Sequence, residues 1–147
     1  MKRIINCFFF MIFLSSCNFS GNVSFSNEEE EKTNAESVAA EFFMAVSQSD
    51  FERTLPLFSE SFFALTSEEQ MLENLKETKV KLGNFETFKL SDWKTLRVKG
   101  SESKSEYLLV YDVKYSNFDA QEIFSMVKEG EKVKIVGYRI NSDGFRY

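Results

Sequence analysis

The sequence predicts an α+β domain in which N-terminal helices pack on a curved, four-stranded antiparallel meander. Apolar residues recur at helical spacing between residues 34 and 82, and the spacing changes to two after Gly83. The strands expected after Gly83 are joined by segments too short for a parallel crossover, so neighbouring strands should run antiparallel. The chain has 147 residues, enough for one such domain and too few for two ordinary ones.

Composition narrows the chemistry that the domain can perform. Hydrophobic residues make up 43% of the chain, and its 17 phenylalanines supply large rings for a core. The sequence has no histidine, which is the commonest general base near neutral pH and the commonest metal ligand. Both cysteines, Cys7 and Cys17, precede the expected domain, so we expect neither a disulfide framework nor a cysteine-ligated zinc site there. We expect no metal and no cofactor.

Residues 1–16 are predicted to be a signal peptide. Lys2 and Arg3 supply positive charge ahead of an apolar run over residues 4–14. A membrane-spanning helix needs about 17–25 apolar residues, whereas the apolar region of a secretory signal needs about 7–15, so the run fits a signal. The last four residues of this segment, LSSC at 14–17, resemble the lipobox of bacterial lipoproteins, in which a branched apolar residue and two small residues precede the modified cysteine.

This resemblance implies that Cys17 is a lipidation site. It implies a thioether-linked lipid on Cys17, cleavage after Ser16, and acylation of the new amine by a fatty chain such as palmitate. One fatty chain binds a bilayer reversibly, at about 10⁴ M⁻¹, so two or three chains would anchor the protein permanently. The resemblance also implies that an Asp directly after the cysteine would favour the inner membrane, so Asn18 at that position favours the outer membrane. We expect a lipid-anchored protein of the bacterial cell envelope. The alternative is an ordinary signal peptide that is cleaved nearby.

Residues 17–33 are predicted to be a flexible, acidic tether. The stretch is small and polar and contains four consecutive glutamates, Glu28 to Glu31, so it buries too little apolar surface to order itself. As a flexible coil it would span about 20–24 Å. The glutamates could contact a cationic partner or bind calcium, but we favour a solvated run that is repelled by anionic headgroups. The folded domain is expected over residues 34–147.

Two helices are expected between residues 34 and 58. The first begins at Asn34, with Thr33 or Asn34 as its cap, and it carries apolar residues at the i, i+3, i+4, i+7 spacing of one buried face. The second is short and begins at Asp50. Pro56 should kink it or end it early, because proline lacks the N–H that a helix interior needs.

A third helix is expected at TSEEQ, residues 66–70. Both Thr66 with Glu69 and Ser67 with Gln70 have the spacing of a capping box. Gly83 should end this helix. Four strands follow, over residues 85–99 (with a bend), 105–115, 120–128 and 132–141.

This order of elements resembles the nuclear-transport-factor-like cone fold. Three stretches resemble bacterial envelope domains with that fold: SDFERTLPLFSESF at 49–62, LTSEEQMLENLKETKVKLGNFETF at 65–88 and KVKIVGYRI at 132–140. They look like the short second helix, the third helix with its entry into the sheet, and the closing strand. The resemblance covers residues 34–140. It implies a cone-like architecture without a particular activity, because one fold hosts many functions.

Asp112 is the sharpest candidate for a catalytic group, because it interrupts the apolar strand YLLVYDVKY. Enzymes with the cone fold that this order of elements resembles use its open end, commonly with an Asp or His base. A carboxylate that faces a cone of Phe and Tyr would have a raised pKa and could act as a base. We favour the alternative that Asp112 is partly solvated near a strand end, beside Lys114 or across from a basic residue.

Four other residues are weaker candidates. Tyr111, Tyr138 and Arg139 could line the opening of the cone and bind a ligand, although amphipathic sheet residues more often cap a core. Trp93 could be a ligand platform, although a packing role is commoner for a buried tryptophan.

Charge is distributed unevenly along the domain. Residues 34–75 carry eight acidic residues and one basic residue, Arg53, whereas residues 76–104 carry eight basic and four acidic residues. The two regions could dock an envelope protein or steer an anionic ligand, or they could complement each other within the fold. The net charge of −5 and the lack of a matching motif argue against nucleic-acid binding.

We therefore expect a non-catalytic binding or assembly module. Its expected partners are the lipid bilayer, through acylated Cys17, and an envelope protein or a small apolar ligand. The alternative is a pocket enzyme of isomerase, hydratase or hydrolase type, with Asp112 as base and a tyrosine as hydrogen-bond donor. An open mouth with convergent polar groups would favour the enzyme, and a cone filled by Phe and Tyr rings would favour the binding module.

Overall fold

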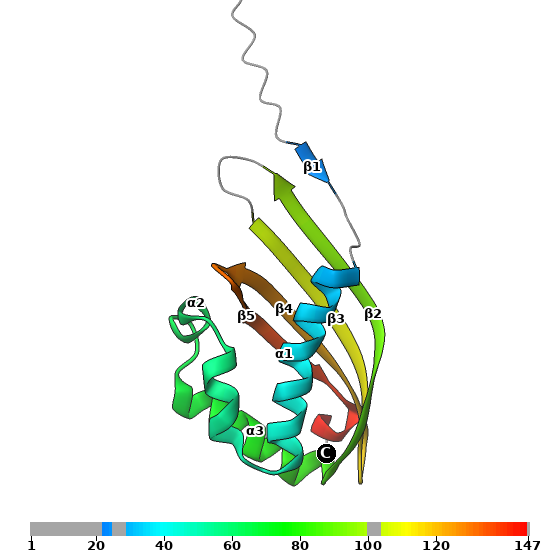
Figure 1. Ribbon diagram of the computed structural model, residues 1–147. Helices are drawn as coiled ribbons and strands as arrows, with labels where there is room; N and C mark the ends of the chain where they lie inside the picture. The colour runs from blue at the N-terminus through cyan, green and yellow to red at the C-terminus, as the bar shows by residue number, and fades with distance from the viewer. Residues whose placement is uncertain (1–21, 25–28, 100–103, 147) are drawn as a thin grey trace, which may run out of the picture.

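The structure is a computed structural model that describes residues 22–24, 29–99 and 104–146. It confirms the α+β class, with helices followed by an open, curved antiparallel sheet (Figure 1). The predicted signal peptide, residues 1–16, and the predicted lipidation site, Cys17, lie outside the described residues. Within the described ranges, no helix is both long and apolar enough to cross a membrane. The elements are β1 (Asn22–Ser24), α1 (Glu29–Ser47), η1 (Phe51–Leu57), α2 (Glu60–Phe63), α3 (Glu68–Leu82), β2 (Phe85–Lys99), β3 (Lys104–Tyr115), β4 (Asp119–Glu129), β5 (Lys132–Asn141) and η2 (Asp143–Arg146).

Five antiparallel strands form one sheet in the order β1-β2-β3-β4-β5. Strands β2 to β5 are the predicted meander, and the predicted bounds of β2 and β5 agree with the structure at both ends. Strand β1 is additional, and it pairs with the end of β2 so that Asn22 lies opposite Lys99. A register shift between Leu90 and Asp92 marks the bend expected in β2, because an extra residue in one strand bends that strand.

Helix α1 begins at Glu29, five residues before the predicted start at Asn34. The predicted tether, residues 17–33, was therefore wrong in part, because its described residues form β1 and the first turns of α1. Acidic side chains stabilise the first turn of a helix because they face the positive end of the helix dipole. The hydroxyl of Tyr107 on β3 also donates a hydrogen bond to Glu31. The described glutamates thus begin a helix and dock it on the sheet.

Helix α3 begins and ends where the sequence indicated. Ser67 is the N-cap, and its Oγ accepts a hydrogen bond from the Gln70 backbone N–H at 3.1 Å, which selects Ser67 over Thr66. Gly83 follows the last turn with a φ of 92°, a conformation that residues with a Cβ rarely adopt. The short second helix is a 3₁₀-helix, η1, which ends one residue after Pro56.

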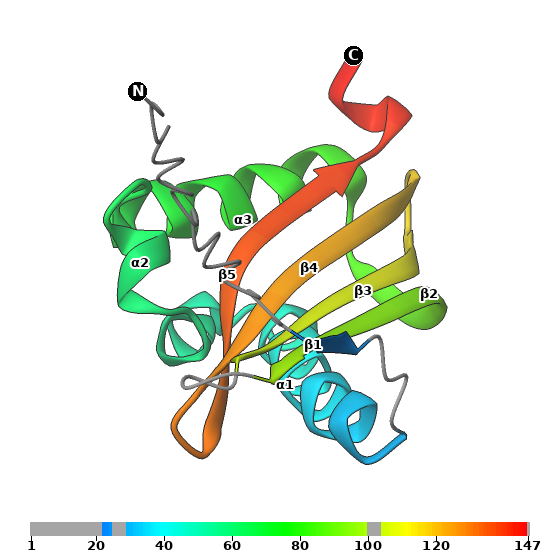
Figure 2. The same cartoon turned by 90° about the horizontal axis from the view of Figure 1, so that it is seen from above.

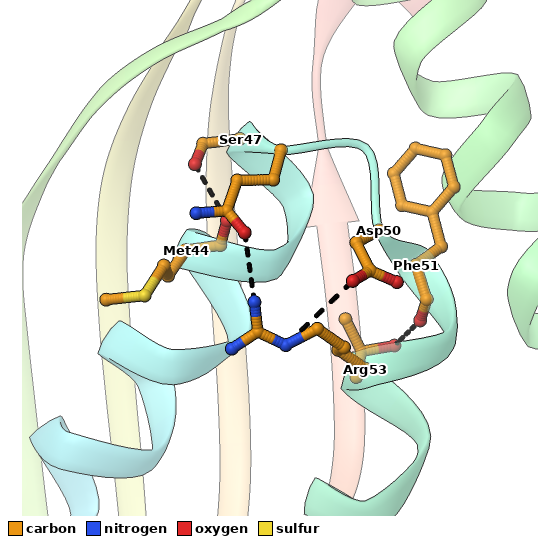
Figure 3. A network of polar contacts seen from close by, with 7 residues as sticks. Met44, Ser47, Asp50, Phe51 and Arg53 are labelled. Carbon is orange, nitrogen blue, oxygen red and sulfur yellow. Dashed lines mark hydrogen bonds and ion pairs between the residues drawn. The ribbon is translucent and has the colours of Figure 1, made fainter.

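A network of polar contacts fixes the turn between α1 and η1 (Figure 3). Arg53 Nη1 donates to Gln48 Oε1 at 2.9 Å, and Arg53 Nε lies 4.0 Å from Asp50 Oδ2. Ser49, within this turn, has a φ of 58° in the left-handed region. From α3, Lys79 Nζ donates to Ser49 Oγ at 2.6 Å. These contacts hold η1 and α3 against the end of α1.

The core lies between α1 and the sheet. Phe42 and Phe43 of α1 have no exposed surface, and their rings lie 5.1 and 5.5 Å from the ring of Phe124 on β4. Tyr111 of β3 packs edge-on against Phe43, with ring centroids 5.2 Å apart. Figure 2 shows α1 beneath the strands and α3 beside β5. Rings therefore fill the space between α1 and the strands.

We predict that Phe42→Ala lowers the free energy of unfolding by about 3–5 kcal/mol, because it removes a buried ring and leaves a cavity. Met44 lies on the same helix with 52% of its surface exposed, so Met44→Ala should change this free energy by less than about 0.5 kcal/mol. Urea denaturation followed by circular dichroism measures both effects. Similar losses in the two variants would contradict this packing.

Candidate functional site

A groove of about 370 Å³ lies between α3 and β5. Its apolar wall includes Met71 and Leu75 of α3 and Ile140 of β5, and Phe62 and Phe145 lie at its margins. Its polar groups are Asn74, Glu77 and Thr78 on α3, Thr66 just before α3, and Tyr138 on β5. Binding sites commonly combine apolar walls with a few polar groups that fix the orientation of a ligand.

A buried carboxyl group stands behind the groove. Glu122 of β4 has no exposed surface, and its Oε2 accepts a hydrogen bond from the Tyr138 hydroxyl at 2.8 Å. Its Oε1 accepts a second hydrogen bond, from the Tyr115 hydroxyl at 2.6 Å. Three adjacent strands supply the three side chains, since Tyr115 lies on β3 and Tyr138 on β5. Tyr138 therefore joins the groove to the buried carboxyl.

Burial controls the ionisation of this cluster. Loss of solvent raises the pKa of Glu122 to about 7, although the hydrogen bonds from Tyr115 and Tyr138 act in the opposite direction. Burial, followed by the nearby Glu122 carboxylate, also raises the pKa of Tyr115 and of Tyr138, so both hydroxyls keep their protons. Near neutral pH, Glu122 is thus the member of the cluster that titrates.

The hydrogen bonds hold the Tyr138 hydroxyl in place, but they do not position Glu122 to exchange a proton with a ligand. Both oxygens of Glu122 accept hydrogen bonds from tyrosines, and the Glu122 side chain does not line the groove. A general base must reach the proton that it removes, at about 2.6–3.2 Å or through one water. A ligand in the groove meets the Tyr138 ring before it meets the carboxyl.

The structure places Asp112 away from the groove. Tyr111 and Val113 are buried on the helix-covered face of β3, so Asp112 between them is exposed on the other face. Asp112 lies across from Lys89 of β2, as the favoured alternative expected. The hypothesis that Asp112 is a base inside the cone was therefore wrong, because a strand directs neighbouring side chains to opposite faces.

The remaining sequence candidates lie in different places. Tyr111 is in the aromatic core and 2% exposed, and Arg139 is exposed on the face of β5 opposite to Tyr138. Only Tyr138 of these three residues lines the groove. Trp93 is half-buried against the core, and Lys32 Nζ lies 5.0 Å from the centre of its ring, which is a packing role.

Glu122 is the residue that the sequence analysis missed. Along β4, Ala120, Phe124 and Met126 are buried at every second position, and Glu122 occupies the same face. The alternation is visible in the stretch AQEIFSM, so a charged residue at a core position was the available signal. Among the described residues, no group of three or more Asp, Glu, Cys or His side chains could hold a metal ion.

A second hollow, of about 600 Å³, lies on the face of the sheet opposite α1, where the described residues place no helix. Its apolar lining comes from Leu96, Leu108, Val127 and Val136. The buried carboxyl and its two tyrosines stand on the opposite face, so we assign the candidate site to the groove rather than to the larger hollow.

Comparison with protein-family models finds none that matches this chain, and comparison with curated proteins finds no significant match. The function proposed below is therefore argued from the geometry and the sequence.

We predict that Glu122→Gln changes the pH dependence of stability. The pKa of Glu122 is about 7 in the folded state and about 4.3 in an unfolded chain, so the folded state binds more protons between these values and wild-type stability falls as pH rises. Glutamine cannot ionise, so the free energy of unfolding of Glu122→Gln, relative to that of the wild type, should rise by about 3 kcal/mol from pH 4 to pH 8.

Urea denaturation at both pH values measures this difference. Glu129→Gln, on an exposed residue of the same strand, is the matched control and should not produce it. A difference between wild type and Glu122→Gln that is constant with pH would contradict the raised pKa.

Proposed function

We propose that the protein is a lipid-anchored binding module of a bacterial cell envelope, and that the groove between α3 and β5 is its ligand site. Two independent observations support the two halves of this proposal. The LSSC sequence at residues 14–17 supports the anchor, because it matches a lipobox at the end of an apolar run. The groove supports the ligand site.

The observation on which the ligand site depends is the pairing of an apolar groove with one fixed polar group. Phe62, Ile140 and Phe145 are only partly buried and offer apolar surface in the groove, so an apolar ligand gains free energy when it leaves water. The Tyr138 hydroxyl is held by Glu122, so the tyrosine ring has a defined position at the base of the groove. A rigid aromatic surface lowers the entropy that a ligand loses on binding.

Catalysis receives less support from the same geometry. The candidate base from the sequence, Asp112, is exposed on the far face of the sheet, as the favoured alternative expected. Glu122 has a pKa near neutrality, which suits an acid or a base, but both of its oxygens are occupied and it does not reach the groove. Binding without chemistry is therefore the function we propose.

Cys17→Ser tests the anchor. In a bacterial expression host, we expect the wild type to fractionate with membranes and the variant to lose that association, because serine cannot form the thioether. Intact-mass spectrometry of the detergent-extracted wild type should show a chain that begins at Cys17 and carries fatty acyl groups. A processed chain with a free thiol at Cys17, or membrane association unchanged in Cys17→Ser, would contradict the anchor.

Asn74→Trp tests the ligand site, because an indole at position 74 would fill the groove from α3. The probe is 1-anilinonaphthalene-8-sulfonate, whose fluorescence rises in apolar surroundings. We expect Asn74→Trp to weaken probe binding at least tenfold. Val80→Trp is the matched control, since Val80 lies on the same helix with 81% of its surface exposed, and it should bind the probe as the wild type does. Equal binding by the two variants would place the probe elsewhere and contradict the site.

A further inference from the structure

Strand β5 is the edge of the sheet beside the groove. One side of β5 pairs with β4, from Glu129 opposite Lys132 to Gln121 opposite Asn141. On the other side, the described residues make one backbone contact, a parallel bridge between Phe58 and Ile135 in which the Ser59 N–H donates to the Ile135 carbonyl at 2.9 Å. The described part of the chain therefore covers the first half of this edge and leaves the second half, residues 138–141, open to the groove.

The open half of β5 presents backbone donors and acceptors. In an antiparallel pair, alternate residues direct their N–H and C=O groups toward the partner strand and away from it. Ile135, opposite Met126, directs its carbonyl away from β4, to Ser59. Phe124 and Glu122 lie two and four residues before Met126 on β4, so their backbone groups point to the same side as those of Met126. They lie opposite Tyr138 and Ile140, respectively. The backbone groups of Tyr138 and Ile140 accordingly point away from β4, toward the groove.

From this arrangement we infer that the ligand of the groove is an extended segment of a partner protein, which adds to the Tyr138–Asn141 edge of β5 as a further strand. Its backbone would pair with Tyr138 and Ile140, and its alternate side chains would enter the groove against the partly exposed rings of Phe62 and Phe145. This inference rests on the proposed function, because it names the partner of the same site. A free strand edge beside a helix supplies both elements of peptide recognition, backbone pairing for affinity and a side-chain groove for specificity.

Charge along the groove indicates which end of the peptide should be basic. The segment from Glu60 to Leu75, which includes α2 and the first half of α3, carries four acidic residues and no basic one. At the other end, Lys81 Nζ lies 3.5 Å from Glu77 and Arg146 Nη1 lies 3.4 Å from Asp143, so carboxylates already pair with these cations. A complementary peptide would place a basic residue toward α2.

The length of the open edge sets the size of the segment. Four strand residues extend about 13 Å, so residues 138–141 can pair with about four residues of a partner. Such a short edge gives few hydrogen bonds, and the apolar side chains in the groove must supply the remaining affinity. We therefore expect apolar residues at alternate positions, with no proline between them, since proline cannot donate to the pairing.

The experiment begins with selection of random eight-residue peptides, displayed on phage, against the full chain in detergent. We expect the selected peptides to share apolar residues at alternate positions. The best peptide is then synthesised with a fluorescent label, both unmodified and with N-methyl groups on the backbone nitrogens that would face β5. N-methylation keeps every side chain and removes the hydrogen bonds, so we expect at least a tenfold loss of affinity by fluorescence polarisation.

Two protein variants locate the peptide on β5. Ile140→Ala removes the side chain and keeps the backbone N–H, whereas Ile140→Pro removes both. The N–H of Ile140 faces away from β4, so proline there should not break the β4–β5 pairing. We expect Ile140→Pro to bind the peptide at least tenfold more weakly than Ile140→Ala. In the wild type, hydrogen exchange of the Tyr138 and Ile140 amides should slow when the peptide is added.

The outcomes separate this inference from the proposed function. A selected peptide that tolerates N-methylation, or that protects backbone amides elsewhere, overturns strand addition while the groove can still bind the fluorescent probe. Failure to select any peptide with alternating apolar residues overturns it as well. If Asn74→Trp leaves the probe bound as in Val80→Trp, the proposed site itself is wrong. The peptide measurements with N-methyl groups need no protein variant, so a misfolded Ile140→Pro chain does not prevent the test.

Discussion

The contact of Phe42 and Phe43 with the sheet determines where this domain can bind anything. These two rings of α1, together with Phe124 and Tyr111, occupy the volume that an open cone would leave for a ligand. Because rings fill the centre, the groove lies at the margin of the domain, where α3 lies beside β5. The same packing that stabilises the fold therefore places the groove between α3 and β5 at an edge strand and not in a central chamber.

Among the residues that the structure describes, Glu122 is the only buried acidic or basic side chain in this interior. Burial of a carboxyl group is unfavourable unless hydrogen bonds compensate for the lost water, and the Tyr115 and Tyr138 hydroxyls provide them. Each tyrosine comes from a different neighbour of β4, so the cluster fixes β3, β4 and β5 in one register and holds the base of the groove in place. Polar contacts of this kind add to the uniqueness of a fold more than to its free energy.

Local signals in the sequence were enough to predict the helices and strands. They do not report contacts between residues that lie far apart in the chain. Ser67, Gly83 and Pro56 set helix boundaries through their own backbone chemistry, so those boundaries could be predicted. The early start of α1 depends partly on Tyr107, which lies 76 residues from Glu31, and no local pattern reports such a contact. Tyr138 was identified as a candidate, and the solvated position favoured for Asp112 agrees with the structure, whereas Glu122 was missed because the strand alternation that places it inside was not applied to β4.

The pairing of β1 with β2 has a consequence for the orientation of the protein if Cys17 carries the proposed lipid anchor. Asn22 sits opposite Lys99, at the end of the sheet far from α3 and the C-terminus (Figure 1). Cys17 lies five residue steps before Asn22, which limits the distance between them to about 18 Å. With acyl chains on Cys17, the Lys99 end of β2 would stand next to the headgroups, and α3 would project outward. The groove between α3 and β5 would then face away from the bilayer, where another protein could reach it.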